Sequence, residues 1–170
     1  MFLCTELVLS MLAFCLGQSE VNVPGNYFFH VVGAFKQGQR VPPCYRQRTE
    51  VLEDASRCMI FQNNTFDFLF PPQELENIEE WQIMLYLTMV TAVPLPATTQ
   101  VGKILMPCQK NSTTKIPIFS TQSQEKIGYT TVTWIFQDSP PSCDRPKPIL
   151  CLPILSSVLQ KGKFRIFLGN

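Results

Sequence analysis

The residues that could carry out chemistry in this chain are few, and their spacing does not favour catalysis. His30 is the only histidine among the 170 residues, so a Ser-His-Asp or Cys-His arrangement would depend on it alone. It lies within an aromatic and β-branched stretch, residues 28–35, where a packed or surface histidine is the simpler interpretation. A secreted hydrolase would need a carboxylate beside His30, and we do not predict an enzyme.

Carboxylates cluster most densely between residues 74 and 80. Glycoside hydrolysis needs two carboxylates on opposite sides of a sugar, and local clustering does not provide that geometry. The segment follows Pro72 and precedes Trp81, which predicts a solvated loop or a single helical turn. The four residues are Glu74, Glu76, Glu79 and Glu80.

The usual motifs for metals, phosphates and nucleic acids are missing from the sequence. It has no Cys-x-x-Cys, no His-Glu-x-x-His and no Gly-rich phosphate loop, so we expect no metal and no cofactor. The formal net charge of +1 is too small to attract a polyanion over the whole surface. Basic and aromatic residues are interleaved over 161–167, and we interpret them as the outer face of a strand rather than a nucleic-acid patch.

Residues 1–17 predict a signal peptide. Their apolar stretch is too short to cross about 30 Å of hydrocarbon as a helix, and the small residues Cys15 and Gly17 suit cleavage. The alternative is a buried N-terminal strand or helix. Cleavage would leave a single domain over residues 18–170.

Loss of this leader would remove Cys4 and Cys15 and leave five cysteines. An odd number in an exported chain indicates two bridges with one free or intermolecular thiol, or a partner outside the sequence. The five are Cys44, Cys58, Cys108, Cys143 and Cys151.

Two N-glycosylation sequons agree with export. They begin at Asn63 and Asn111, in polar and loop-like settings. Leader, cysteines and sequons together predict the secretory pathway, with a product that is secreted, or displayed at the cell surface if a longer form carries an anchor.

Short alternating segments predict an all-β fold. Residues 65–70 and 129–136 alternate apolar and polar side chains, as strands with one wet face do. Residues 81–90 belong to the longest apolar run after the leader and are placed centrally in a sheet. Seven to nine strands separated by turn signals predict an antiparallel, immunoglobulin-like β-sandwich stapled by disulfides. Residues 163–168 supply its last predicted strand.

Four motifs follow one another between residues 49 and 170. They are TEVLEDASRCMIF, EEWQIMLYLTMVTA, VGKILMPCQ, and a close cysteine pair followed by Pro-Ile-Leu and a basic-aromatic strand. This order resembles the ectodomain of the uroplakin III family, including its 3b-like members. The resemblance implies pairing of Cys58 with Cys108 and of Cys143 with Cys151, with Cys44 left over, although four cysteines allow three connectivities.

The resemblance also implies a non-enzymatic role. Uroplakin III proteins are single-pass glycoproteins of urothelial and some other epithelia, and their ectodomain packs against a tetraspanin uroplakin in the apical membrane. The sequence has no run of about 20 apolar residues after its last predicted strand. We therefore expect a secreted or truncated product, or an anchor in sequence beyond the end, and membrane association only by family analogy.

The candidate interface is the outward side of the strand over residues 80–92. Met84 and Tyr86 are expected to be exposed there, opposite Ile83 and Leu85, and Tyr and Met are enriched in protein interfaces. The loop over residues 140–148 is a second candidate.

The alternative function from another class is a secreted, lipocalin-like carrier of a small apolar ligand. The 13 phenylalanines could line the cavity of a β-barrel. However, the Gly-x-Trp signature of such carriers is missing, since Gly25 is followed by Asn-Tyr. The interaction-domain hypothesis is therefore preferred.

Overall fold

Alternating segments of the sequence form the strands of an antiparallel structure. The computed structural model describes residues 10–137. The elements are β1 (Ser10–Val21), β2 (Gly25–Lys36), β3 (Gln39–Val41), β4 (Leu52–Ala55), β5 (Thr65–Phe70), the 3₁₀ turns η1 (Pro72–Glu74) and η2 (Ile78–Glu80), β6 (Gln82–Thr91), β7 (Ala97–Pro107), β8 (Thr113–Ser120) and β9 (Lys126–Gln137).

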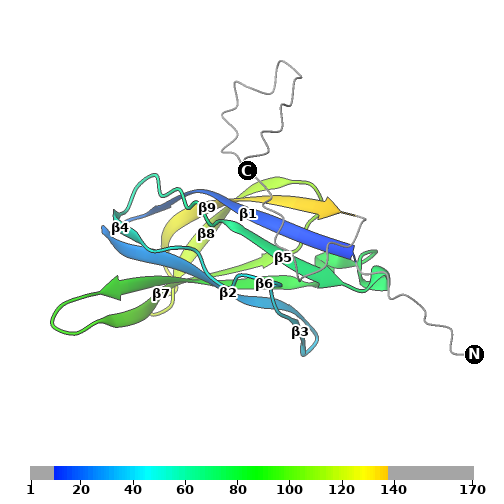
Figure 1. Ribbon diagram of the computed structural model, residues 1–170, viewed down its shortest axis with the longest axis horizontal. Helices are drawn as coiled ribbons and strands as arrows, with labels where there is room; N and C mark the ends of the chain where they lie inside the picture. Colours follow the sequence, from blue (N-terminus) through cyan, green and yellow to red (C-terminus); the bar gives the residue numbers. More distant parts are fainter. Residues whose placement is uncertain (1–9, 138–170) are drawn as a thin grey trace, which may run out of the picture.

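The strands are arranged in the order β3-β2-β6-β7-β8-β9-β1-β5, and β4 also pairs with β2. Every pairing is antiparallel, and the sheet folds into a barrel-like sandwich. In Figure 1, β1 and β5 lie in one layer and β2, β6 and β7 in the other. The prediction of an all-β antiparallel sandwich is confirmed, and so is the central position of residues 81–90, because β6 lies between β2 and β7.

The chain between β3 and β5 connects the two edges of the sheet. On one side, Thr49 N–H donates a hydrogen bond of 3.0 Å to Phe29 O in β2, and on the other, Cys44 N–H donates one of 2.8 Å to Asp67 O in β5. Backbone groups at both edges therefore find partners, which protects edges that would otherwise pair with another chain.

Aromatic rings fill the space between the layers. Phe14 of β1 packs against Phe66 and Phe68 of β5, with ring centroids 5.2 and 6.1 Å apart, and against Trp134 of β9 at 5.4 Å. Contacts of this kind add about 0.5–1.5 kcal/mol each beyond the burial of their area. The core is thus centred on β1 and its two neighbours.

Residues 10–17, which the sequence analysis assigned to a leader, form most of the core strand β1. Leu12, Phe14 and Leu16 are fully buried, and the strand pairs with β5 on one side and β9 on the other. A strand buried on both faces has a continuous apolar sequence, and this composition is also that of a signal-peptide core. In the structure these residues form a buried strand, and removal of residues 1–17 as a leader stays a prediction.

The expected disulfide between Cys58 and Cys108 is not formed, and both residues are free thiols. Cys58 adjoins the bridge that Met59 makes with Ser19, toward the end of β1. Cys108 N–H donates a hydrogen bond to Trp81 O. The Trp81 ring packs against the Phe70 ring, and Phe70 is paired with Ser10 at the start of β1. These two ends of β1 are about 30 Å apart at roughly 3.3 Å per residue, whereas a disulfide needs Cα atoms within about 7 Å.

Two further cysteines, Cys15 and Cys44, also differ from the expectation. Cys15 and Cys44 are disulfide-bonded, whereas the sequence analysis removed the first with the leader and left the second unpaired. Burial raises the pKa of the free Cys108 thiol to about 12. Cys143, Cys151, the loop over residues 140–148 and the predicted strand over residues 163–168 lie outside the described residues.

Candidate interaction face

The outer side of β6 is formed by residues that alternate with the core. Ile83 and Leu85 are fully buried, so Met84 and Tyr86 point to the opposite side of the sheet. Both side chains are half-buried there. The alternation predicted the side of the sheet correctly, and the role of these two residues in an interface stays a prediction.

Neighbouring strands extend this surface. Tyr86 is paired with His30 of β2 and with Lys103 of β7, and Met84 is paired with Leu105 of β7. Leu105 is 50% exposed. We call the surface formed by these five residues the β6 face. It has an apolar and aromatic centre, with a lysine and a histidine beside it.

Three members of this surface, His30, Lys103 and Leu105, were not predicted from the sequence. Lys103 and Leu105 alternate with the buried Ile104 and Met106, and this signal places them on an outer face. Which residues lie opposite one another depends on the register, and β-bulges interrupt the pairings of β6 with both β2 and β7. Local pattern does not locate such bulges.

Charge on the β6 face has one sign. The sequences of β2, β6 and β7 contain no Asp or Glu, and their lysines are Lys36 and Lys103. A surface with an apolar centre and a cationic neighbour is complementary to a partner that presents apolar side chains bordered by carboxylates.

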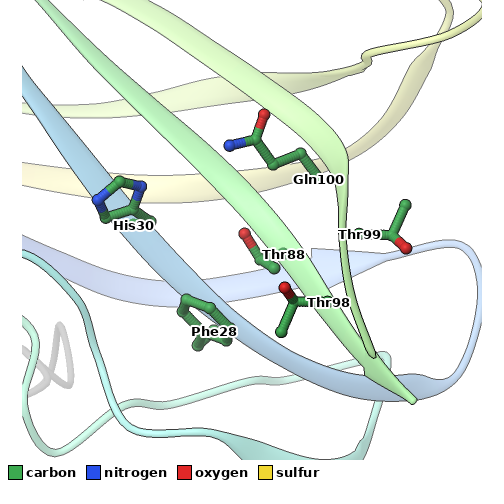
Figure 2. Close-up of a pocket in the computed structure, with 6 residues that line it drawn as sticks. All are labelled: Phe28, His30, Thr88, Thr98, Thr99 and Gln100. Carbon is green, nitrogen blue, oxygen red and sulfur yellow. The ribbon is translucent and has the colours of Figure 1, made fainter. Parts of the chain in front are cut away.

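A shallow pocket of about 490 Å³ adjoins the β6 face. Figure 2 shows Phe28 and His30 on β2, beside Thr88 of β6 and Gln100 of β7. The guanidinium carbon of Arg48 lies 5.7 Å from the centroid of the Phe28 ring. The lining residues are Phe28, His30, Thr88, Thr98, Thr99 and Gln100. They include no carboxylate, so the His-carboxylate pair that the hydrolase hypothesis requires is not formed in this pocket.

The glutamate cluster is organised by Lys36 and Trp81. Lys36 Nζ lies 2.7 Å from Glu74 Oε2 and 2.8 Å from Glu80 Oε2, and Trp81 Nε1–H donates to Glu74 Oε2 at 3.0 Å. The hydrogen bond from Lys36, followed by that from Trp81, lowers the pKa of Glu74, and the bonds to Glu74 and Glu80 raise the pKa of Lys36. The segment forms the short turns η1 and η2, in agreement with the predicted loop or helical turn.

Replacing Lys36 with Gln is expected to lower the free energy of unfolding at pH 7 and to have little effect at pH 3. Because the pKa of Glu74 is lowered by folding, its contribution is full above the ordinary glutamate pKa of about 4.3 and is lost as the pH falls through the folded value. Because the pKa of Lys36 is raised by folding, its contribution is full below the ordinary lysine pKa of about 10.4 and is lost as the pH rises through the folded value. Urea unfolding measures the difference, with Arg57→Gln at an exposed position as the control. An equal loss at both pH values would argue against an ionic contribution.

Both sequon asparagines, Asn63 and Asn111, are exposed. Asn63 N–H donates to Glu50 Oε2 at 3.0 Å. Asn111 has a positive φ of 44°, and its Oδ1 accepts a hydrogen bond of 3.1 Å from Phe136 N–H. Both asparagine side chains lie on the surface, where a glycan can be attached, and their glycosylation stays a prediction.

Within residues 10–137, none of the helical segments has the length and apolar character needed to span a bilayer. In the same part of the chain, no three His, Cys, Asp or Glu side chains are grouped so that they could hold a metal ion.

Comparison with known proteins bears on the fold. No protein-family model and no curated protein matches the sequence. Among solved structures, a C2 domain of plant extended synaptotagmin 1 is similar, with a TM-score of 0.53, 10% identity, and coverage of 78% of this chain and 96% of that chain. At this identity the likeness concerns the fold alone. The sandwich therefore resembles a C2 domain, where the sequence analysis expected an immunoglobulin-like one.

Proposed function

We propose that this chain is a non-enzymatic interaction domain that binds a protein partner through the β6 face. The observation that carries the proposal is the 50% exposure of Leu105 beside the half-buried Met84 and Tyr86. Aromatic and Met side chains are enriched at the centres of protein interfaces. Because β6 is paired on both sides, these side chains are held on a rigid sheet, which lowers the entropy that binding must overcome.

The partner is a protein surface with an apolar centre and an acidic border. Lys103 and His30 lie beside Tyr86 in the pairing of the strands, and the three strands carry no carboxylate that would repel such a border. Attraction between exposed charges of this kind raises the association rate and is screened by salt.

The finer proposal is an extracellular glycoprotein of the uroplakin III type that packs against a tetraspanin uroplakin at an epithelial cell surface. The order of the motifs between residues 49 and 170 supports it, as do the exposed Asn63 and Asn111. Since Cys58 and Cys108 are free, the support comes from motif order and not from a shared disulfide.

The secretory pathway is supported by other cysteines. Cys15 and Cys44 are disulfide-bonded, and disulfides persist mainly in oxidising compartments. A location in that pathway is therefore part of the proposal.

The lipocalin-like alternative has less support. The Phe14 ring contacts the rings of Phe66 and Phe68, and the pocket beside His30 lies on the outer side of the sheet and not in the core. A carrier would retain a lipid through gentle purification, which native mass spectrometry detects.

Replacing both Tyr86 and Leu105 with Ala is expected to weaken binding to a tetraspanin uroplakin by about tenfold or more, because central interface side chains contribute about 1–2 kcal/mol or more each. Biolayer interferometry with the full chain and the partner in nanodiscs measures the affinity at low and high salt. Ile60→Ala, at a residue that is 48% exposed outside the β6 face, is the matched control.

The outcomes separate the two levels of the proposal. Unchanged affinity in the double variant, or an equal loss in Ile60→Ala, would count against the β6 face. If the unmodified chain does not bind the tetraspanin uroplakin at all, the uroplakin assignment is wrong.

A further inference from the structure

The pocket beside the β6 face is lined by polar side chains that have no hydrogen-bond partner in the described part of the chain. Thr88 is the most buried of them, at 5% exposure, and it lines the pocket together with His30 and Gln100. Within residues 10–137, the Thr88 hydroxyl, the His30 ring and the Gln100 side-chain amide make no hydrogen bond. A buried polar group normally has a partner, so the Thr88 hydroxyl is available to a ligand.

Three neighbouring strands bring these side chains together. Thr88 of β6 is paired with Phe28 of β2 and with Gln100 of β7, and His30 lies two residues from Phe28 on the same side of β2. Figure 2 shows the side chains of Thr88 and Thr98 next to each other among these residues. A β-bulge interrupts the pairing of β6 with β7 directly before Thr88. Bulges bend a strand and redirect its side chains, which accounts for a hollow at this point of the sheet.

A positive charge lies at the edge of the pocket. Arg48 forms a backbone bridge with His30, and its guanidinium carbon lies 5.7 Å from the centroid of the Phe28 ring, close enough for a cation–π contact. Within residues 10–137, the ion pairs are those of Lys36 with two glutamates, so no carboxylate there is paired with Arg48. Because β2, β6 and β7 also contain no Asp or Glu, an anion that enters the pocket is attracted and meets no like charge from these strands.

The lining indicates the class of ligand. Hydroxyl, amide and imidazole groups both donate and accept hydrogen bonds, and so do the hydroxyl groups of a sugar ring. The guanidinium of Arg48 favours an oxyanion, to which it can donate charge-assisted hydrogen bonds. The pocket volume of about 490 Å³ lies within the range of about 300–1,000 Å³ that is typical of small-ligand sites. A hydroxylated ring that carries a carboxylate or a sulfate group matches both the polar lining and the charge.

We propose that this pocket binds an acidic saccharide, a sugar whose ring carries a carboxylate or a sulfate group. The Thr88 hydroxyl and the Gln100 amide hydrogen-bond the hydroxyl groups of the sugar, and Arg48 pairs with its anionic group. The site does not depend on the proposed protein interface, because Thr88, Gln100 and Arg48 all lie outside the β6 face. Recognition of a glycan is thus a second binding activity of the same sheet.

Calorimetric titration of the purified full chain tests the class of ligand. The probes are sialyllactose, which carries a carboxylate, lactose sulfated on its galactose, and lactose itself. We expect at least one acidic sugar to bind about tenfold or more tightly than lactose, because hydrogen bonds to a charged group are the stronger kind. The acidic sugar that binds identifies the anionic group as carboxylate or sulfate. Equal affinity for lactose, no binding of any probe, or equally tight binding of inorganic sulfate would overturn the proposal.

Thr88→Val separates a role in binding from a role in the fold. Valine has about the volume of threonine without its hydroxyl, so we expect the affinity for the acidic sugar to fall about three- to tenfold. Urea unfolding should change little, because this hydroxyl has no partner within residues 10–137. Thr113→Val, at an exposed position of β8, is the matched control and should leave the affinity unchanged. A folded Thr88→Val variant with full affinity would contradict the proposed site.

Two exposed positions provide variants that do not touch the core. Arg48→Gln is expected to reduce the affinity for the acidic sugar to about that for lactose, because it removes the positive charge beside the pocket. Leu105→Ala, which alters the β6 face, is expected to leave the affinity for the sugar unchanged. Full affinity in Arg48→Gln, or a loss in Leu105→Ala as large as that in Thr88→Val, would show that this pocket is not a separate saccharide site.

Discussion

A chain that begins at Gln18 is expected not to fold. It would lose Leu12, Phe14 and Leu16, which are fully buried, and burial of such side chains contributes roughly 1.5–3 kcal/mol each. Their sum is comparable with the whole free energy of unfolding of a typical domain, about 5–15 kcal/mol. β5 would also lose its neighbouring strand, because its register partners are residues 10–15 of β1. Circular dichroism and size-exclusion chromatography of the purified chain measure the outcome.

A point substitution gives the same test without truncation. Phe14→Ala is expected to lower the free energy of unfolding by about 3–5 kcal/mol, because it leaves a cavity between rings that now contact Phe14. Val93→Ala, at a residue that is 85% exposed, is the control and should change stability by less than about 0.5 kcal/mol. A chain from Gln18 that unfolds cooperatively with the β spectrum of the full chain would show that β1 is not part of the core.

The alternation of apolar and polar residues predicted those strands that have one side in the core and the other side outside it. Residues 65–70 and 129–136 form β5 and part of β9 as expected, because one side of each strand packs in the core and the other does not. Residues 10–17 are apolar on both sides, and both sides are buried. Without alternation, the sequence does not separate such a strand from the apolar segment of a signal peptide.

The predicted pairing of Cys58 with Cys108 was wrong for a different reason. Motif order implied that Cys58 pairs with Cys108, but pairing depends on which ends of strands meet in three dimensions. Cys58 follows a short edge strand, β4, and Cys108 follows β7, and the register of β1 separates the two positions. That separation follows from the order of the strands in the sheet, which no local pattern carries.

The candidate face was predictable in part for a related reason. The alternation within β6 placed Met84 and Tyr86 on one side of the strand, and this required only the residues of that strand. Their neighbours Lys103 and Leu105 come from β7, and the register that brings them alongside includes a bulge. A shift of one residue would exchange outward and inward side chains, so the composition of the face had to come from the structure.

Replacing Gly128 of β9 with Ala is expected to destabilise the protein more than replacing Gly17 of β1 with Ala. A Cβ atom at this position would lie 2.0 Å from Glu20 O and 3.0 Å from Val21 Cα, both backbone atoms of β1. Side-chain rotation cannot relieve contacts with backbone, so β9 and β1 would have to separate. The expected loss in the free energy of unfolding is about 3 kcal/mol or more, at the upper end of the range for overpacked sites.

Gly38→Ala is the matched control, because a Cβ there meets nothing within 4 Å and the cost comes from its φ of +81° alone. That strain is worth about 1–2 kcal/mol, so urea unfolding should rank Gly128→Ala clearly below Gly38→Ala. If the two variants are equally stable, β1 and β9 do not approach as closely as the pairing of Val21 with Gly128 requires. The same register places Gln137 beside Met11 at the other end of these strands, so this result would also count against the position of β1 between β5 and β9.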